Sequence, residues 1–221
     1  MDSWLQRLVV RGPAADVTTF RKAAASPAQP IYMTMAPQLR TQKLSFIKLI
    51  AALPEKLASA IGKPEEPWDL VMDPADTITD GTIELTYKFQ LDAFECELLV
   101  AAISTVYPRL CFVLGTVEPS GDEQSSLMAH SGKVWRWRVS NRLKNIITAK
   151  IPEETAENEG EVSSALAEAD WEMMDAVVEH WKEKVTKISS EVALEATLSP
   201  ESRRDRRRRS ERKPRRSRAT R

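Results

Sequence analysis

The chain of 221 residues is poor in the side chains on which disulfide scaffolds and metal sites depend. It has two cysteines, Cys96 and Cys111, and two histidines, His130 and His180. Two cysteines are too few for a disulfide framework or a zinc knuckle, and two histidines argue against metal catalysis. We therefore predict no metal site and no cofactor, and we interpret both cysteines as core residues.

Signals for membrane insertion, export and common catalytic sites are also missing. No stretch approaches the roughly 20 apolar residues that a membrane-spanning helix needs, and the start of the chain lacks the order of an export signal. There is no Walker loop, no nucleophile elbow and no paired-cysteine spacing. We expect a cytoplasmic protein that has no membrane contact and is not an enzyme.

Two weaker catalytic patterns are present, and each has a plain structural alternative. His130 has three serines nearby in a predicted loop, but closeness in sequence does not make a general base, so we interpret it as a surface residue. Glu118, with Asp122 and Glu123, can supply paired carboxylates for a nuclease-like reaction. A polar turn is the more common role of such a group.

The formal net charge of zero hides three regions of different charge. Residues 201–221 hold twelve basic and three acidic residues, a net charge of +9, whereas residues 151–200 hold three basic and thirteen acidic residues, a net charge of −10. The remainder is close to neutral. This division predicts an α+β domain over 1–150, a linker over 151–160, an acidic amphipathic helix over 161–197 and a disordered tail over 198–221.

Hydrophobic periodicity predicts strands and helices within residues 1–150. Trp4 to Val10 and Thr82 to Phe89 alternate as half-buried strands do, and Leu110 to Val117 is apolar on both faces. Each of the first two of these strands is followed by residues with helical spacing. One apolar helix face begins after Pro13, and another begins after Asp92. The other expected elements are a second strand or an extended connection over Leu44 to Leu53 and an added strand over Val134 to Val139.

The resulting order is strand, helix, strand, strand, helix, strand. It is the order of the ferredoxin-like fold, a split βαβ arrangement in which two helices cover one face of an antiparallel sheet. We predict this α+β fold, followed by a long C-terminal helix and the disordered basic tail.

Several segments resemble one family of small domains. Residues 3–24 read SWLQRLVVRGPAADVTTFRKAA and residues 44–57 read LSFIKLIAALPEKL, and Tyr107-Pro108-Arg109-Leu110 precedes a strand that ends at Glu118. These pieces resemble the YubB-type ferredoxin-like domains of bacterial plasmids and phages, most of which have no assigned activity. The resemblance covers about residues 3–140 and departs from the family at FQLDAFEC, where members tend to carry an aromatic and two prolines. It implies the fold and an origin on a mobile element, but no reaction.

Residues 161–197 carry an apolar stripe whose members step by three or four residues. A helix of this length must bury the stripe, either on its own domain, in self-association, or in the groove of a partner. The stripe residues that we single out for a partner contact are Leu166, Met173, Val177, Trp181 and Ile188.

The end of the chain is rich in arginine. Arginine outnumbers lysine eleven to one in residues 201–221, and its guanidinium binds phosphate through two hydrogen bonds and stacks on bases. A plain solubility tail does not require that choice, so we predict nucleic-acid contact, with RNA or DNA, that is largely independent of sequence. The predicted contact residues are Arg203, Arg204, Arg206, Arg207, Arg208, Arg209, Arg212, Lys213, Arg215, Arg216, Arg218 and Arg221.

A second candidate contact is the segment Trp135-Arg136-Trp137-Arg138. Alternation in a strand puts the two indoles on one face and the guanidiniums of Arg136 and Arg138 on the other. The indoles can stack on unpaired bases while the arginines hold phosphate. The competing interpretation, which we favour, is two core tryptophans with arginines outside.

The sequence thus favours a non-enzymatic accessory protein that binds nucleic acid through its tail. The alternative is a protein-protein interaction module of a mobile element, an inhibitor or adaptor, in which the tail is incidental. A third hypothesis is the nuclease-like enzyme. We also predict that the acidic segment binds the basic tail within one chain and competes with phosphate.

Overall fold

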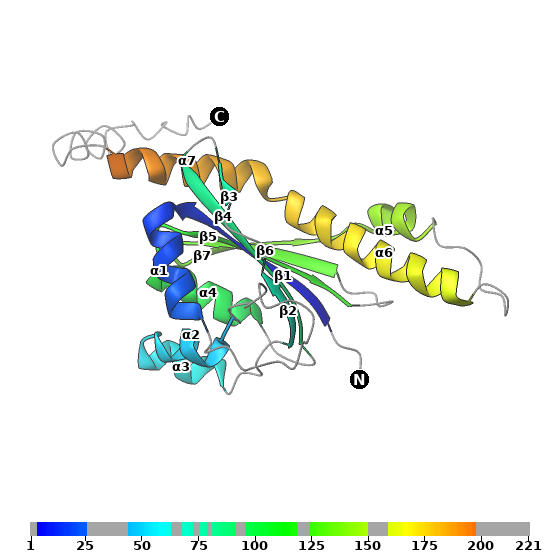
Figure 1. Ribbon diagram of the computed structural model, residues 1–221, viewed down its shortest axis with the longest axis horizontal. Helices are drawn as coiled ribbons and strands as arrows, with labels where there is room; N and C mark the ends of the chain where they lie inside the picture. The colour runs from blue at the N-terminus through cyan, green and yellow to red at the C-terminus, as the bar shows by residue number, and fades with distance from the viewer. Residues whose placement is uncertain are drawn as a thin grey trace, which may run out of the picture.

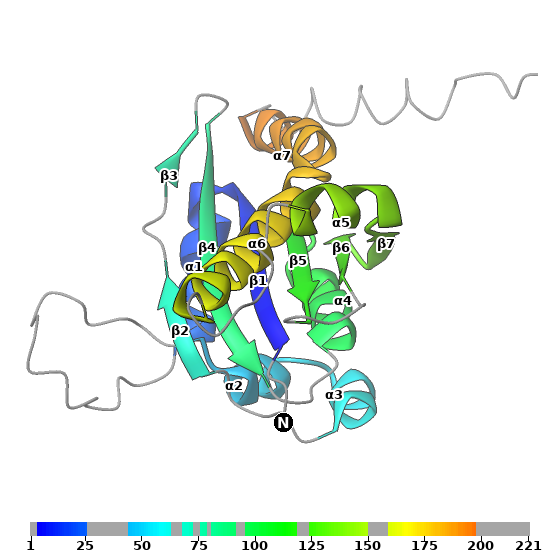
Figure 2. The ribbon, with the colours of Figure 1, turned by 90° about the vertical axis from the view of Figure 1, so that its right-hand side faces the viewer.

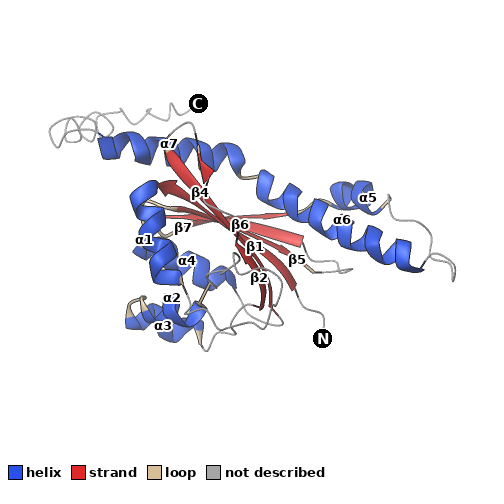
Figure 3. Ribbon diagram, in the orientation of Figure 1, coloured by secondary structure: helices blue, strands red, loops and turns tan. Residues whose placement is uncertain are grey.

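The computed structural model describes residues 4–25, 44–62, 68–72, 76–78, 81–91, 96–118, 124–149 and 159–197. They form an α+β fold with helices on both faces of one antiparallel sheet (Figures 1 and 3). The strands are β1 (Trp4–Pro13), β2 (Trp68–Met72), β3 (Asp76–Thr77), β4 (Thr82–Leu91), β5 (Cys111–Val117), β6 (Gln124–His130) and β7 (Lys133–Arg138). The helices are α1 (Ala14–Ala24), α2 (Phe46–Ala51), α3 (Glu55–Ile61), α4 (Cys96–Val106), α5 (Asn141–Thr148), α6 (Glu159–Glu179) and α7 (Lys182–Thr197).

The sheet formed by the described residues has the strand order β2-β4-β1-β5-β6-β7, and the short β3 pairs with β4. Neighbouring strands are antiparallel throughout. β1 is central, since Leu8 lies opposite Tyr87 of β4 on one side and Leu114 of β5 on the other. Because side chains alternate along a strand, this register sends one set of residues to each face of the sheet.

The first face is covered by α1 and α4, with α2 and α3 beside them (Figure 1). The residues between these helices and the sheet form one continuous hydrophobic cluster. Phe20 of α1 has no exposed surface, and its ring meets the ring of Tyr107 edge to face at 5.3 Å and that of Phe112 at 5.4 Å between centroids. This cluster is the main core of the molecule.

The second face is covered by α6 and α7, and α5 packs beside α6 (Figure 2). Close approach of α6 depends on Gly115 of β5. A Cβ at this position would lie 2.8 Å from Sδ of Met174 and 3.0 Å from Cγ2 of Val177, closer than carbon and sulfur atoms pack. The absence of a side chain at Gly115 therefore lets α6 sit directly on the strand.

The predicted long C-terminal helix is confirmed as helical but is divided at His180 and Trp181. The amide of Trp181 bonds the carbonyl of Val178 at 3.1 Å, a tighter turn than the four-residue bond that Val185 then makes back to Trp181 at 2.8 Å. The indole of Trp181 donates from Nε1 to Oγ of Ser126 in β6 at 2.8 Å, which ties the break to the sheet. A straight helix of this length would leave the twisted sheet, so the change of direction keeps both halves in contact with it.

One predicted strand is wrong. Leu44 to Leu53, expected as a second strand or an extended connection, contains α2. Ser45 caps this helix, because its Oγ accepts a hydrogen bond from the amide of Lys48 at 3.3 Å, and Phe46 and Leu49 are buried at helical spacing. The second strand in chain order is instead β2, and the sequence prediction also missed β3, α3, α5 and β6.

The prediction that helices cover one face of the sheet was incomplete, since α6 and α7 cover part of the other face. α6 begins at Glu159, inside the predicted linker. The rest of that linker, residues 151–158, and the predicted disordered tail, residues 198–221, lie outside the described residues.

Candidate functional site

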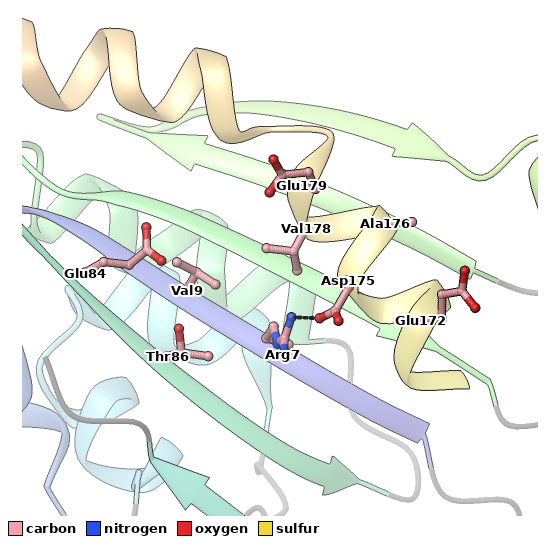
Figure 4. Close-up of a pocket in the computed structure, with 9 residues that line it drawn as sticks. All are labelled: Arg7, Val9, Glu84, Thr86, Glu172, Asp175, Ala176, Val178 and Glu179. Atoms are coloured by element: carbon pink, nitrogen blue, oxygen red, sulfur yellow. Dashed lines mark hydrogen bonds and ion pairs between the residues drawn. The ribbon is translucent and has the colours of Figure 1, made fainter. Parts of the chain in front are cut away.

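A groove of about 620 Å³ lies on the second face, between the sheet and α6 (Figure 4). Its lining comes from three elements that are far apart in the sequence, β1, β4 and α6. The lining residues are Arg7, Val9, Glu84, Thr86, Glu172, Asp175, Ala176, Val178 and Glu179.

Alternation in the strands determines which side chains form the floor. Val9 of β1 lies opposite Thr86 of β4 in the register, and both point away from the main core, which takes their neighbours Leu8 and Leu85. Glu84 and Arg7 follow the same alternation on their strands. In Figure 4 all four side chains rise toward α6 from adjacent strands.

The helix supplies the wall of the groove. Glu172, Asp175 and Glu179 are three and four residues apart, so they share one flank of α6. Met174 and Val177, between them in sequence, are buried against the sheet. The apolar stripe thus holds the helix down while the acidic flank stays at the groove.

Charge in the groove is predominantly negative, with four carboxylates and one guanidinium in the lining. Nη1 of Arg7 donates to Oδ1 of Asp175, an ion pair in which the Arg7 side chain is 16% exposed and the Asp175 side chain 66% exposed. Burial raises the pKa of Glu84, while Arg11 and Lys182 lower it by attraction and Asp76 and Glu179 raise it by repulsion. A cation in the groove would relieve the cost of keeping this half-buried carboxylate charged.

The carboxylates are dispersed rather than gathered at a point. Among the residues that the structure describes, no three His, Cys, Asp or Glu side chains are grouped so as to hold a metal ion. Glu84 approaches the groove from the sheet, and the other three carboxylates come from the helix (Figure 4). Such a spread suits an extended cationic ligand better than a single metal ion.

The structure also brings together Cys111 and His130, which the sequence analysis treated separately. They lie opposite each other on β5 and β6, with 3.7 Å between Sγ and Nδ1. The same Nδ1 lies 3.1 Å from the carbonyl oxygen of Leu110, and because a carbonyl only accepts, Nδ1 carries the hydrogen. Burial raises the pKa of Cys111 to about 11, so the pair does not produce a reactive thiolate at neutral pH.

The strand β7 places its tryptophans and arginines on opposite faces. Trp137 stacks on His180 with 4.1 Å between ring centroids and 6° between planes, and Nζ of Lys184 lies 3.9 Å from the ring centroid of Trp135. On the other face, Nε of Arg136 donates to Oε2 of Glu97 at 2.9 Å, and Arg138 is exposed. One face of each indole is therefore already occupied by a side chain of the same protein.

Most of the helix residues singled out for a partner contact pack within the chain. Met173 and Val177 are buried with Leu5 and Val117, and Trp181 is buried in the neighbouring cluster. Ile188 is partly buried against that second cluster, and Leu166 is partly buried. The sheet of the same chain thus covers this stripe.

Other predicted site residues fall at the edge of the described residues or outside them. Glu118 follows the end of β5 and is partly buried, whereas Asp122 and Glu123 lie outside the described residues. The twelve basic residues of 201–221 also lie outside them. His130, expected in a loop, is the last residue of β6.

None of the residues that line the groove was among the site residues predicted from the sequence, although two local patterns bear on it. The alternation of residues 82–89 already placed Glu84 and Thr86 on the side away from the core, and the acidic excess of residues 151–200 was plain. The polar face of β4 and the acidic residues of α6 meet only because α6 packs on the sheet beside β1. No local pattern carries that information.

Comparisons with protein-family models, with curated proteins and with solved structures found no match to this sequence. No helix among the described residues is both long and apolar enough to span a membrane.

Proposed function

We propose that the protein is a non-enzymatic accessory protein that binds nucleic acid through residues 201–221, here called the Arg-rich segment. The observation that carries the proposal is the composition of this segment, eleven arginines and one lysine against three acidic residues. Guanidinium groups bind phosphate oxygens in pairs and stack on bases, and they remain charged at any physiological pH.

The packing of the C-terminal helices supports this proposal over the protein-protein alternative. The apolar stripe that a partner groove would need is largely buried on the chain's own sheet. Within the part of the chain that the structure describes, the large apolar side chains that remain exposed each lie on a different helix. They are Ile47, Leu98, Ile146, Trp171 and Leu194.

The proposal includes a ferredoxin-like core that serves as a scaffold. The order β2-β4-β1-β5, with α1 and α4 on one face, is the order that a split βαβ repeat produces, and β6 and β7 extend its edge. The resemblance to YubB-type domains agrees with such a core and remains a hypothesis. In this scheme α7 joins the scaffold to the Arg-rich segment, which acts in the cytoplasm.

Binding by this route is expected to depend strongly on salt. Each phosphate that is neutralised releases condensed counterions, so about six contacts would weaken binding on the order of 10³-fold between 50 and 200 mM salt. The same contacts would favour RNA and DNA, single-stranded or double-stranded, with little regard to base sequence.

The test is a salt series of binding to single- and double-stranded RNA and DNA. We would compare the full chain, a chain that ends at residue 200, and a matched-charge variant in which the eleven arginines of the Arg-rich segment are lysines. The shortened chain is expected to bind at least about tenfold more weakly at low salt, and the lysine variant to keep the salt dependence with lower affinity. Equal affinity of the full and shortened chains, or no binding by the full chain in dilute buffer, would overturn the proposal.

A further inference from the structure

The floor of the groove includes a part of the sheet that the described helices cover only in part. α6 packs over β5, β6 and β1, and α7 reaches only one end of β4 (Figure 2). Glu84 and Thr86 of β4 face the side of α6 and α7 but are only half-buried. The face of β4 and the acidic flank of α6 therefore form the floor and one wall of an open groove (Figure 4).

The groove is suited to arginine in both charge and shape. Its lining carries four carboxylates and one guanidinium, in which Asp175 pairs with Arg7 and Glu179 accepts a hydrogen bond from Nζ of the neighbouring Lys182 at 2.7 Å. With Lys182 included, the net charge is −2. Val9, Ala176 and Val178 offer apolar surface between the carboxylates. A long side chain that lays its methylene groups on such surface while its charged end reaches a carboxylate matches this arrangement.

The Arg-rich segment carries the complementary charge, +9, at the end of the same chain. Glu179 and Thr197 are 18 residues apart in nearly continuous helix, a distance of about 27 Å at 1.5 Å per residue. Arg206 is nine positions after Thr197, and at about 3.3 Å per residue this stretch spans up to about 30 Å. From Arg206 onward, the Arg-rich segment is long enough to return to the groove.

We infer that the groove between β4 and α6 binds the Arg-rich segment of its own chain, and that nucleic acid must displace this segment in order to bind. The inference rests on the proposed function for its biological consequence, because it makes the groove a competitor for the phosphate-binding arginines. A tethered segment has an effective concentration in the millimolar range, so weak individual contacts are sufficient for competition.

The first test measures competition. In the full chain, Glu84, Glu172 and Glu179 are each replaced by Gln, which leaves the Arg7–Asp175 pair in place. A matched control replaces three exposed carboxylates outside the groove, Glu55→Gln, Glu191→Gln and Glu195→Gln, and has the same net charge. We expect the groove variant to bind a single-stranded oligonucleotide at least about fivefold more tightly than wild type at low salt, and the control less than about twofold.

Two outcomes of this measurement would overturn the inference. If the two variants gain affinity equally, the effect is one of net charge and the groove has no special part. If neither gains affinity, the groove does not compete.

The second test needs no nucleic acid, so it distinguishes failure of this inference from failure of the proposed function. Lys213 is the only lysine of the Arg-rich segment, and a carbodiimide joins an amine to a carboxylate that it touches. In the full chain we expect Lys213 to be linked mainly to the groove carboxylates, and the links to disappear in high salt. Links spread evenly over the groove carboxylates, Glu191 and Glu195, or no intramolecular link, would refute docking even if the full chain binds nucleic acid.

Discussion

The face of the sheet under α1 and α4 is closed by one continuous apolar cluster, whereas the face under α6 and α7 is held by two smaller clusters and by polar ties. On that second face Arg7 pairs with Asp175 of α6, and Arg11 donates from Nη1 to Oγ1 of Thr186 of α7 at 2.9 Å. The groove opens beside these ties. The first face therefore contributes most of the stability, whereas the second face positions the charged side chains of the groove.

The largest expected effect comes from the first face. Phe20→Ala should lower the free energy of unfolding by about 3–5 kcal/mol, because it empties the centre of the main cluster and removes two edge-to-face ring contacts. Met174, on α6, is equally buried on the second face. Met174→Ala should lower the free energy of unfolding by about 2–3 kcal/mol, since α6 can relax toward the gap. Urea unfolding of both variants measures the difference, and a greater loss for Met174→Ala would contradict the comparison.

A smaller effect is expected where α6 touches the sheet. Gly115→Ala puts a methyl group against Met174 and Val177 and should cost about 1–3 kcal/mol through overpacking. Because Met174 Sδ is the nearest atom, Gly115→Ala should cost less in a Met174→Ala background. A double-mutant cycle measures this coupling. Strictly additive losses would show that α6 is not seated on Gly115 in the way described.

The smallest effect concerns Glu84 and depends on pH. Because the pKa of Glu84 is raised in the folded protein, the folded state binds more protons than the unfolded state between the ordinary carboxyl pKa and the raised one, and stability falls as pH rises through that window. Glu84→Gln should therefore raise the unfolding midpoint slightly at pH 7. The gain should vanish as the pH falls to the ordinary carboxyl range, and a gain that persists unchanged there would exclude titration of Glu84 as its cause.

Local patterns predicted those elements in which apolar residues that face the core recur at regular spacing. β4 was expected from the alternation of Ile83, Leu85 and Tyr87, and these residues do face the main cluster. Leu44 to Leu53 misled the prediction because a short apolar run fits a strand or a helix, and the cap at Ser45 decides between them. The weakly patterned β2 and β6 escaped detection, since pairing with neighbouring strands determines them more than their own composition does.

The candidate site, too, depends partly on local sequence and partly on tertiary packing. The amino-acid order by itself determined the α+β class, the apolar stripe of residues 161–197 and the separation of charge along the chain, because periodicity and composition are local properties. Only the tertiary structure decided that α6 returns to β5 at Gly115, that the helix breaks at Trp181, and that Glu84 joins Glu172 and Glu179 around one groove. These contacts depend on close packing between segments far apart in sequence. The missing side chain at Gly115 allows α6 to approach β5, and the local sequence pattern does not predict this.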